Sequence, residues 1–181
     1  MGFVAYVLNA PALSVPAQVT THLQMHGFCN NTDMNVYDAD IKDLLKHYQY
    51  FTVYGLSPQT EKPSFYVPEY MRDHGWDIVG TYPKQHAAGG FKVYPSLKDV
   101  PPEYRRFVDV FRSSERVSEV VDEVLAVGGV EVLWLQLGIS NPEAEARAEK
   151  AGIKVVSNRC LIIEHRKYFS ENTSNLSNLS D

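Results

Sequence analysis

Apolar residues form alternating strand-like and helix-like runs between about residue 38 and residue 169. The strand-like runs are short and almost continuously apolar, whereas the helix-like runs place apolar residues three or four positions apart. We expect helices over 38–48, 64–74, 114–127, 141–151 and 160–169, and one helical turn over 96–100. We expect strands over 50–54, 76–81, 107–111, 130–137 and 153–157, with a brief extended piece over 92–94.

This alternation is typical of βαβ units, and near-continuous apolar strands are typical of a parallel sheet that is buried on both faces. We therefore predict an α/β fold, with a doubly wound, mainly parallel, five-stranded Rossmann-like sheet and helices on both faces. Sheets of this kind bind ligands beyond the carboxyl ends of their strands, where the strand order reverses. The loops that follow the strands are therefore the segments in which to look for function.

The two ends of the chain differ from this central part. Residues 1–35 contain scattered proline and glycine but no lysine or arginine, so we expect a poorly ordered or loosely docked extension. Residues 170–181 are rich in serine and asparagine and predict a disordered polar tail. A single domain over 36–169 remains, and it is long enough to bury its own core.

Composition and charge narrow the classes of partner. The net charge of -5 argues against nucleic acid or an anionic membrane as a partner held by summed positive charge. No apolar stretch approaches the roughly 20 residues that cross a bilayer. The two cysteines, Cys29 and Cys160, lie far apart and at no metal-binding spacing, so we expect no disulfide, no metal site and a cytoplasmic location. We expect a small molecule as the partner.

The turn after the first predicted strand has the features of an anion site. Gly55, Leu56 and Ser57 follow that strand, and Lys62 and Ser64 precede the next helix. This order aims backbone N–H groups, a helix N-terminus and a lysine at one anion. It matches neither the G-x-G-x-x-G dinucleotide fingerprint nor the P-loop. A phosphate site of another kind is therefore predicted, and the simpler alternative is that Gly55 only permits a tight turn.

The loop after the second predicted strand adds a weaker signal. Thr81 and Tyr82 occupy the strand end where an NAD site needs an acidic residue for the ribose hydroxyls. Pro83 and Lys84 then begin a loop that contains glycines, and Lys84 is a candidate contact for a second phosphate. An ordinary solvated loop would have the same composition.

Three later segments carry a specific resemblance. They are the runs from Val108 to Glu115, from Leu133 to Asn141 and from Ser157 to Cys160. Together with the first turn, these segments closely resemble the small bacterial-type CoA-binding-domain proteins, in order and at the family spacing, over about residues 36–168. The fold is also similar to the CoA-binding domain of the succinyl-CoA synthetase α-subunit.

The resemblance implies binding of coenzyme A or a short acyl-CoA at the carboxyl edge of the sheet. The residues that it places at the CoA phosphates are Gly55, Ser57, Lys62 and Ser64, and Leu56 in the same turn is a further cofactor-binding residue. It places Pro83 and Lys84 beside the nucleotide, and the residues that border the pantetheine are Phe111, Arg112, Gln136 and Gly138. Two departures matter. Lys62 stands where relatives usually carry arginine, and Pro68 falls in the first turns of the helix predicted from Ser64, where its missing N–H and its ring could delay the helix start to about Val67.

No recognisable catalytic motif accompanies these binding residues. The chain has no G-x-S-x-G elbow and no H-E-x-x-H run, so the sequence favours a non-catalytic binding protein over an enzyme. The alternatives are an enzyme that acts on an acyl-CoA or uses NAD, and a partner-binding module on the same fold. Cys160 follows the last strand and has two interpretations, a buried inert thiol or a site of mixed-disulfide formation with CoA.

Overall fold

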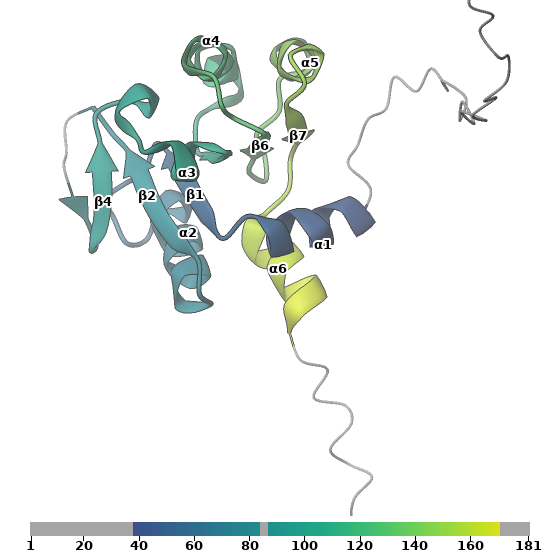
Figure 1. Cartoon of the computed structure of the whole chain (residues 1–181). Helices are drawn as coiled ribbons and strands as arrows, with labels where there is room; N and C mark the ends of the chain where they lie inside the picture. Colours follow the sequence, from purple (N-terminus) through teal and green to yellow (C-terminus); the bar gives the residue numbers. More distant parts are fainter. Residues whose placement is uncertain (1–37, 84–86, 171–181) are drawn as a thin grey trace, which may run out of the picture. The chain divides into compact units, whose positions relative to one another are not determined.

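The computed structural model describes residues 38–83 and 87–170, which lie in one compact unit (Figure 1). Most of the segments predicted over 1–35 and 170–181 lie outside the described residues, as does Lys84. The described helices are α1 (Asp38–His47), α2 (Pro63–Asp73), α3 (Pro102–Arg105), α4 (Val117–Val127), α5 (Pro142–Lys150) and α6 (Leu161–Phe169), with 3-10 turns η1 (Leu97–Asp99) and η2 (Ser114–Arg116). The strands are β1 (Tyr50–Tyr54), β2 (Asp77–Thr81), β3 (Ala87–Ala88), β4 (Phe91–Tyr94), β5 (Phe107–Val110), β6 (Val132–Leu135) and β7 (Lys154–Val156).

These strands form one sheet in the order β3-β4-β2-β1-β5-β6-β7. All neighbouring pairs are parallel except β3 with β4. Counted along the chain, the parallel strands have the order 3-2-1-4-5-6, which is the order of doubly wound dinucleotide-binding sheets. The direction of winding therefore reverses between β1 and β5, and this is the point at which the fold predicts a ligand.

The α/β class, the parallel sheet and the Rossmann-like arrangement are confirmed, but the prediction of five strands is wrong. The piece expected over 92–94 is the full strand β4, which pairs with β2 through Val79, Gly80 and Thr81. The two-residue β3 then adds an antiparallel edge to the six parallel strands. The sequence pattern of strand β4 predicts a strand only weakly, because the strand is short and exposes Lys92 between two buried apolar residues.

Helices cover both faces of this sheet (Figure 1). On one face, α1, α2 and α6 pack against strand side chains such as Phe51 and Trp134. On the other face, α4 and α5 pack against the alternate strand side chains, such as Val108 and Leu133. Both faces of β5 and β6 are therefore buried, which explains their near-continuous apolar sequences.

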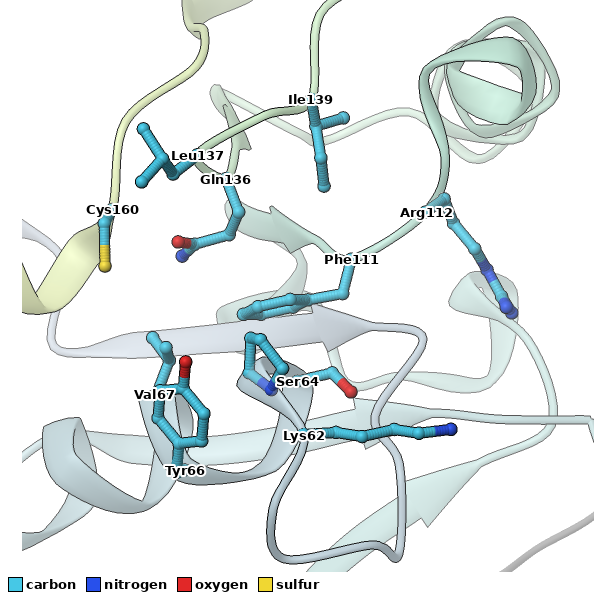
Figure 2. Close-up of a pocket in the computed structure, with 11 residues that line it drawn as sticks. Lys62, Ser64, Tyr66, Val67, Phe111, Arg112, Gln136, Leu137, Ile139 and Cys160 are labelled. Carbon is cyan, nitrogen blue, oxygen red and sulfur yellow. The ribbon is translucent and has the colours of Figure 1, made fainter.

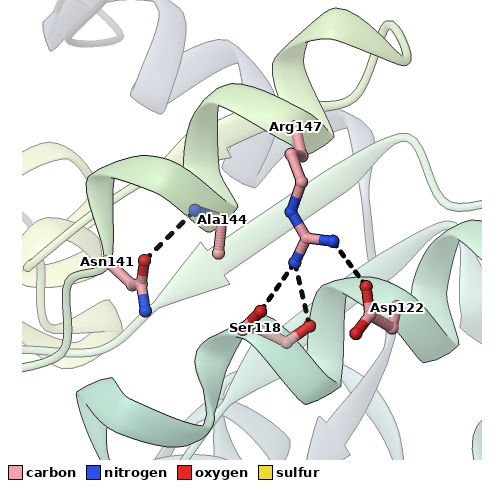
Figure 3. Close-up of polar contacts among 5 residues, drawn as sticks. All are labelled: Ser118, Asp122, Asn141, Ala144 and Arg147. Carbon is pink, nitrogen blue, oxygen red and sulfur yellow. Dashed lines mark hydrogen bonds and ion pairs between the residues drawn. The ribbon is translucent and has the colours of Figure 1, made fainter.

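The start of α5 shows how local sequence fixes one helix. The Asn141 side chain accepts a hydrogen bond from the Ala144 N–H at 3.1 Å, and Pro142 occupies the first helical position, as predicted. Further along α5, the guanidinium of Arg147 bonds Asp122 at 2.5 Å and the hydroxyl of Ser118 at 2.8 Å (Figure 3). Because Asp122 and Ser118 belong to α4, these bonds join the two helices of this layer.

Several element boundaries differ from the prediction. Helix α2 begins at Pro63 rather than near Val67, because the N–H groups of Phe65 and Tyr66 both bond the Lys62 carbonyl, at 2.9 and 3.1 Å. Pro68 lies buried inside α2, where it has no N–H to donate to the carbonyl of Ser64, four residues earlier. Strand β6 ends at Leu135, and the following residues turn into the loop at the carboxyl edge. None of the described helices is long and apolar enough to cross a membrane.

Candidate functional site

A cleft of about 380 Å³ opens at the carboxyl edge of the sheet, beside the point where the strand order reverses (Figure 2). Its walls come from the start of α2 and from the loops that follow β5, β6 and β7. The lining residues are Lys62, Pro63, Ser64, Tyr66, Val67, Phe111, Arg112, Gln136, Leu137, Ile139 and Cys160. Five of the residues predicted to bind a ligand are therefore brought together here, namely Lys62, Ser64, Phe111, Arg112 and Gln136.

Gly55 does not line the cleft, but it allows the loop after β1 to approach the end of β5 closely. Its φ is +94°, and a Cβ atom at this position would lie 2.8 Å from the Phe111 carbonyl oxygen and 3.2 Å from Nε of Arg112. A side chain at Gly55 would therefore push the end of β5 away from the loop after β1. The structure requires glycine here for a close backbone approach as well as for the turn.

Leu56 and Ser57 hold the same loop in place. The Leu56 side chain is fully buried and fills the space above Gly80, where a Cβ atom would lie 2.5 Å from its Cδ2 atom. The hydroxyl of Ser57 accepts a hydrogen bond from the Gln59 N–H at 3.2 Å. Any contact of Leu56 with a ligand would therefore come from its backbone, because its side chain belongs to the core.

One end of the cleft is positively charged. The Lys62 amine and the Arg112 guanidinium both lie at this end (Figure 2), and neither has a carboxylate partner among the described residues. The N–H of Ser64 lies at the second position of α2, where the helix offers it no acceptor. Two cations and a helix N-terminus with its partial positive charge make this end a site for an anion.

The Tyr54 ring packs against the Arg112 side chain. The guanidinium lies over the Tyr54 ring, with 5.6 Å between its central carbon and the ring centroid. The Tyr54 hydroxyl donates to Glu123 at 2.5 Å, which fixes the ring. Burial, with help from this hydrogen bond, raises the pKa of Tyr54 well above its usual range. The ring therefore remains a neutral platform for the arginine.

The opposite end of the cleft is apolar. Leu137 and Tyr66 face this end with 62% and 43% of their surfaces exposed, and the Cys160 thiol lies beside them (Figure 2). Phe111 lies between the two ends, whereas the Gln136 amide and the Tyr66 hydroxyl point toward the Cys160 side. The cleft therefore changes along its length from a cationic end to an apolar end.

A buried carboxyl lies under the middle of the cleft. Nε2 of Gln136 donates to Oδ1 of Asp109 at 2.8 Å, and Asp109 is fully buried. Its second oxygen, Oδ2, has no hydrogen-bond partner among the described residues. Burial raises the pKa of Asp109 well above its usual range, although the bond from Gln136 opposes this shift. No role was predicted for Asp109, although an acidic residue within the apolar run Phe107–Val110 is a signal that could have pointed to one.

Gly138 and Asn158 join the two loops at the apolar end. The N–H of Gly138 donates to the Asn158 side chain at 2.7 Å, and the Asn158 N–H donates to the Ile139 carbonyl at 3.2 Å. Both residues have positive φ, +81° and +56°. Gly138 therefore shapes the rim without lining the cleft.

The remaining predicted residues lie apart from this cleft or outside the described chain. Pro83 is exposed in the turn after β2 and does not line the cleft, and Lys84 lies outside the described residues. No histidine lines the described part of the cleft. The ring of His165 instead bonds the Tyr70 hydroxyl at 3.0 Å and stacks on Phe169. Within the described residues, Cys160 therefore has no histidine beside it at the cleft.

Comparison with known proteins places this site within a family. Residues 49–166, which include every residue that lines the cleft, match the family model of the CoA binding domain. The uncharacterized protein YneT of Bacillus subtilis is 32% identical over 127 residues, which cover 70% of this chain and 93% of YneT. A hypothetical protein from Pyrococcus horikoshii OT3 is similar in structure, with a TM-score of 0.69, 33% identity and coverage of 74% of this chain and 92% of its own. A Thermus thermophilus structure has a TM-score of 0.67, 33% identity and coverage of 74% and 99%.

Proposed function

Because this chain belongs to the CoA binding domain family, we propose that it binds coenzyme A or a short acyl-CoA in the cleft at the carboxyl edge of its sheet. The observation that carries this proposal is the change from a cationic end to an apolar end along one cleft. CoA has the matching order of groups, with phosphates at one end and a pantetheine arm that ends in a thiol at the other.

The phosphates are proposed to lie at the start of α2. There the Ser64 N–H, the Lys62 amine and the Arg112 guanidinium converge on the cationic end. Hydrogen bonds to charged phosphate oxygens are about twice as strong as bonds between neutral groups. The nucleotide would then extend toward Pro83 and Lys84, as the family resemblance implies.

The pantetheine arm is proposed to cross the middle of the cleft. Phe111 offers an apolar surface there, and Gln136 offers amide hydrogen bonds to the two amides of the arm. The bond to Asp109 holds the Gln136 side chain in one position, so this contact is preorganised. The thiol or thioester would then reach the end lined by Leu137 and Cys160.

We propose binding without turnover. Thioester chemistry needs a nucleophile paired with a base, or a general base aimed at water. The described cleft residues include the Cys160 thiol but no histidine or carboxylate beside it. The predictions of a cytoplasmic location and of no nucleic-acid or membrane partner are kept as part of this proposal.

Calorimetric titration of charge variants with CoA tests the assignment. Lys62→Met and Arg112→Met each remove one cation from the cleft, and we expect each to weaken CoA binding by about tenfold or more, because each loses a charge-assisted hydrogen bond of about 1.5–3 kcal/mol. Lys154→Met is the matched control, since Lys154 is exposed at the start of β7, at the opposite edge of the sheet. Equal CoA affinity in all three variants and the wild type would contradict the proposal.

A further inference from the structure

The two ends of the cleft differ in charge, and this difference bears on which acyl group the site accepts. Figure 2 places the Lys62 amine and the Arg112 guanidinium together at one end, away from Leu137 and Cys160. No cation lines the end that holds Leu137 and Cys160 in the described chain. We infer that the thioester end of the cleft selects uncharged apolar acyl groups and discriminates against acyl groups that end in a carboxylate. This inference rests on the proposed CoA function.

The side chains at this end favour an apolar group. Leu137 is the most exposed large apolar side chain of the described residues, at 62%, and Tyr66, which is 43% exposed, lies on the facing wall with its hydroxyl toward the cleft (Figure 2). Val67 lies beside Tyr66 on α2, and Ile139 lies between Leu137 and Arg112. An acyl chain that covers these side chains removes apolar surface from water on both partners, which is favourable for each methylene that is buried.

The charged groups nearest to this end offer nothing to a carboxylate. Arg159 precedes Cys160, but its guanidinium bonds the Glu164 carboxylate at 3.0 Å. Glu164 is buried, so the charge of Arg159 is already paired with a carboxylate of the protein itself. An acyl carboxylate in the cleft would therefore lose water without gaining a free cation, which is unfavourable.

The carboxyl of Asp109 adds to this discrimination. It lies under Gln136, fully buried, with one oxygen unpartnered among the described residues. When it is protonated it carries no charge to attract an anion, and it does not line the cleft to offer a hydrogen bond there; when it is ionised it repels an anion. In neither state does the floor of the cleft help to hold a carboxylate.

A matched pair of ligands tests the inference. Butyryl-CoA and succinyl-CoA both carry four-carbon acyl groups, and only the second ends in a carboxylate. We expect butyryl-CoA to bind wild-type protein more tightly than CoA, by about fourfold for each methylene that becomes buried. We expect succinyl-CoA to bind at least about tenfold more weakly than butyryl-CoA, because its carboxylate loses water against apolar side chains and gains no cation. Calorimetric titration measures all three affinities.

A cation placed at the apolar end should reduce this preference. Leu137→Lys adds an amine at the rim of the cleft, and we expect it to lower the ratio of butyryl-CoA to succinyl-CoA affinity at least threefold. Leu125→Lys is the control, because Leu125 is also an exposed leucine but lies on α4, on the other face of the sheet. It should leave the ratio unchanged.

The outcomes separate this inference from the proposed function. If none of the three thiol or thioester ligands binds, the proposed function itself fails. If CoA binds but succinyl-CoA binds as tightly as butyryl-CoA, the function stands and the inference is overturned. An unchanged ratio in folded Leu137→Lys protein would also overturn it, because the acyl group would then lie elsewhere.

Discussion

Replacement of Gly55 by alanine tests whether a close backbone approach shapes the site. Gly55 and Gly75 have the same φ, +94°, so alanine at either position is strained by about 1–2 kcal/mol. Only at Gly55 does the added Cβ atom meet a neighbour, the Phe111 carbonyl oxygen at 2.8 Å, whereas at Gly75 nothing lies within 4 Å. Relief of that contact must move the backbone after β5, which adds about 1–3 kcal/mol.

We therefore expect Gly55→Ala to lower the free energy of unfolding by about 2–5 kcal/mol, and Gly75→Ala to lower it by about 1–2 kcal/mol. Urea unfolding followed by tryptophan fluorescence measures both values. The loss of chain entropy that alanine causes in the unfolded state is similar in the two variants, so it cancels in their difference. Equal destabilisation by the two variants would contradict this prediction, because the contact with Phe111 would then cost nothing.

Three further variants test buried and ion-paired groups of the domain. Burial raises the pKa of Asp109 well above its usual range, so the folded state holds a proton that the unfolded chain releases near pH 4, and stability falls as the pH rises from there toward the raised pKa. Asp109→Asn should remove this decline, so its stability relative to wild type should rise between pH 5 and pH 8 in urea unfolding. Hydrogen bonds, first from Arg106 and then from Tyr48, lower the pKa of Glu131 from 4.5 to about 2, so its contribution is complete above pH 4.5 and is lost as the pH falls to about 2. Glu131→Gln should cost about 1 kcal/mol or less at pH 7, because the ion pair is half exposed, and nothing near pH 2, as acid titration of both proteins would show. Arg147→Met removes the bonds between α4 and α5 and should cost about 1–2 kcal/mol of stability while CoA affinity in calorimetry stays unchanged.

Local signals in the sequence were sufficient for much of the fold. The start of α5 was predictable because Asn141 and Pro142 act within one helical turn. Strands β5 and β6 were predictable because burial on both faces leaves a continuous apolar run. The number of strands was not predictable in this way. Strand β4 is short, lies near the edge of the sheet and has the exposed Lys92 between two buried residues.

The candidate site was predictable where its residues follow strand ends. Lys62, Phe111 and Gln136 come from loops that a parallel sheet brings to one edge, so their meeting in one cleft follows from topology. The roles of Leu56 and Asp109 depend instead on packing across the sheet. The sequence does not show that Leu56 fills the space above Gly80, or that the Asp109 carboxyl meets Gln136, because both contacts join residues more than 20 positions apart.

Titration of the wild-type protein with CoA, NAD and ATP under identical conditions tests whether the cleft is a CoA site. NAD and ATP share the adenine nucleotide and the phosphates, but neither carries the pantetheine arm that the apolar part of the cleft would bind. We predict one CoA bound per chain, with an affinity at least about tenfold higher than for NAD or ATP, which corresponds to about 1.4 kcal/mol. Binding of NAD or ATP as tight as that of CoA, or no binding of CoA at all, would contradict it.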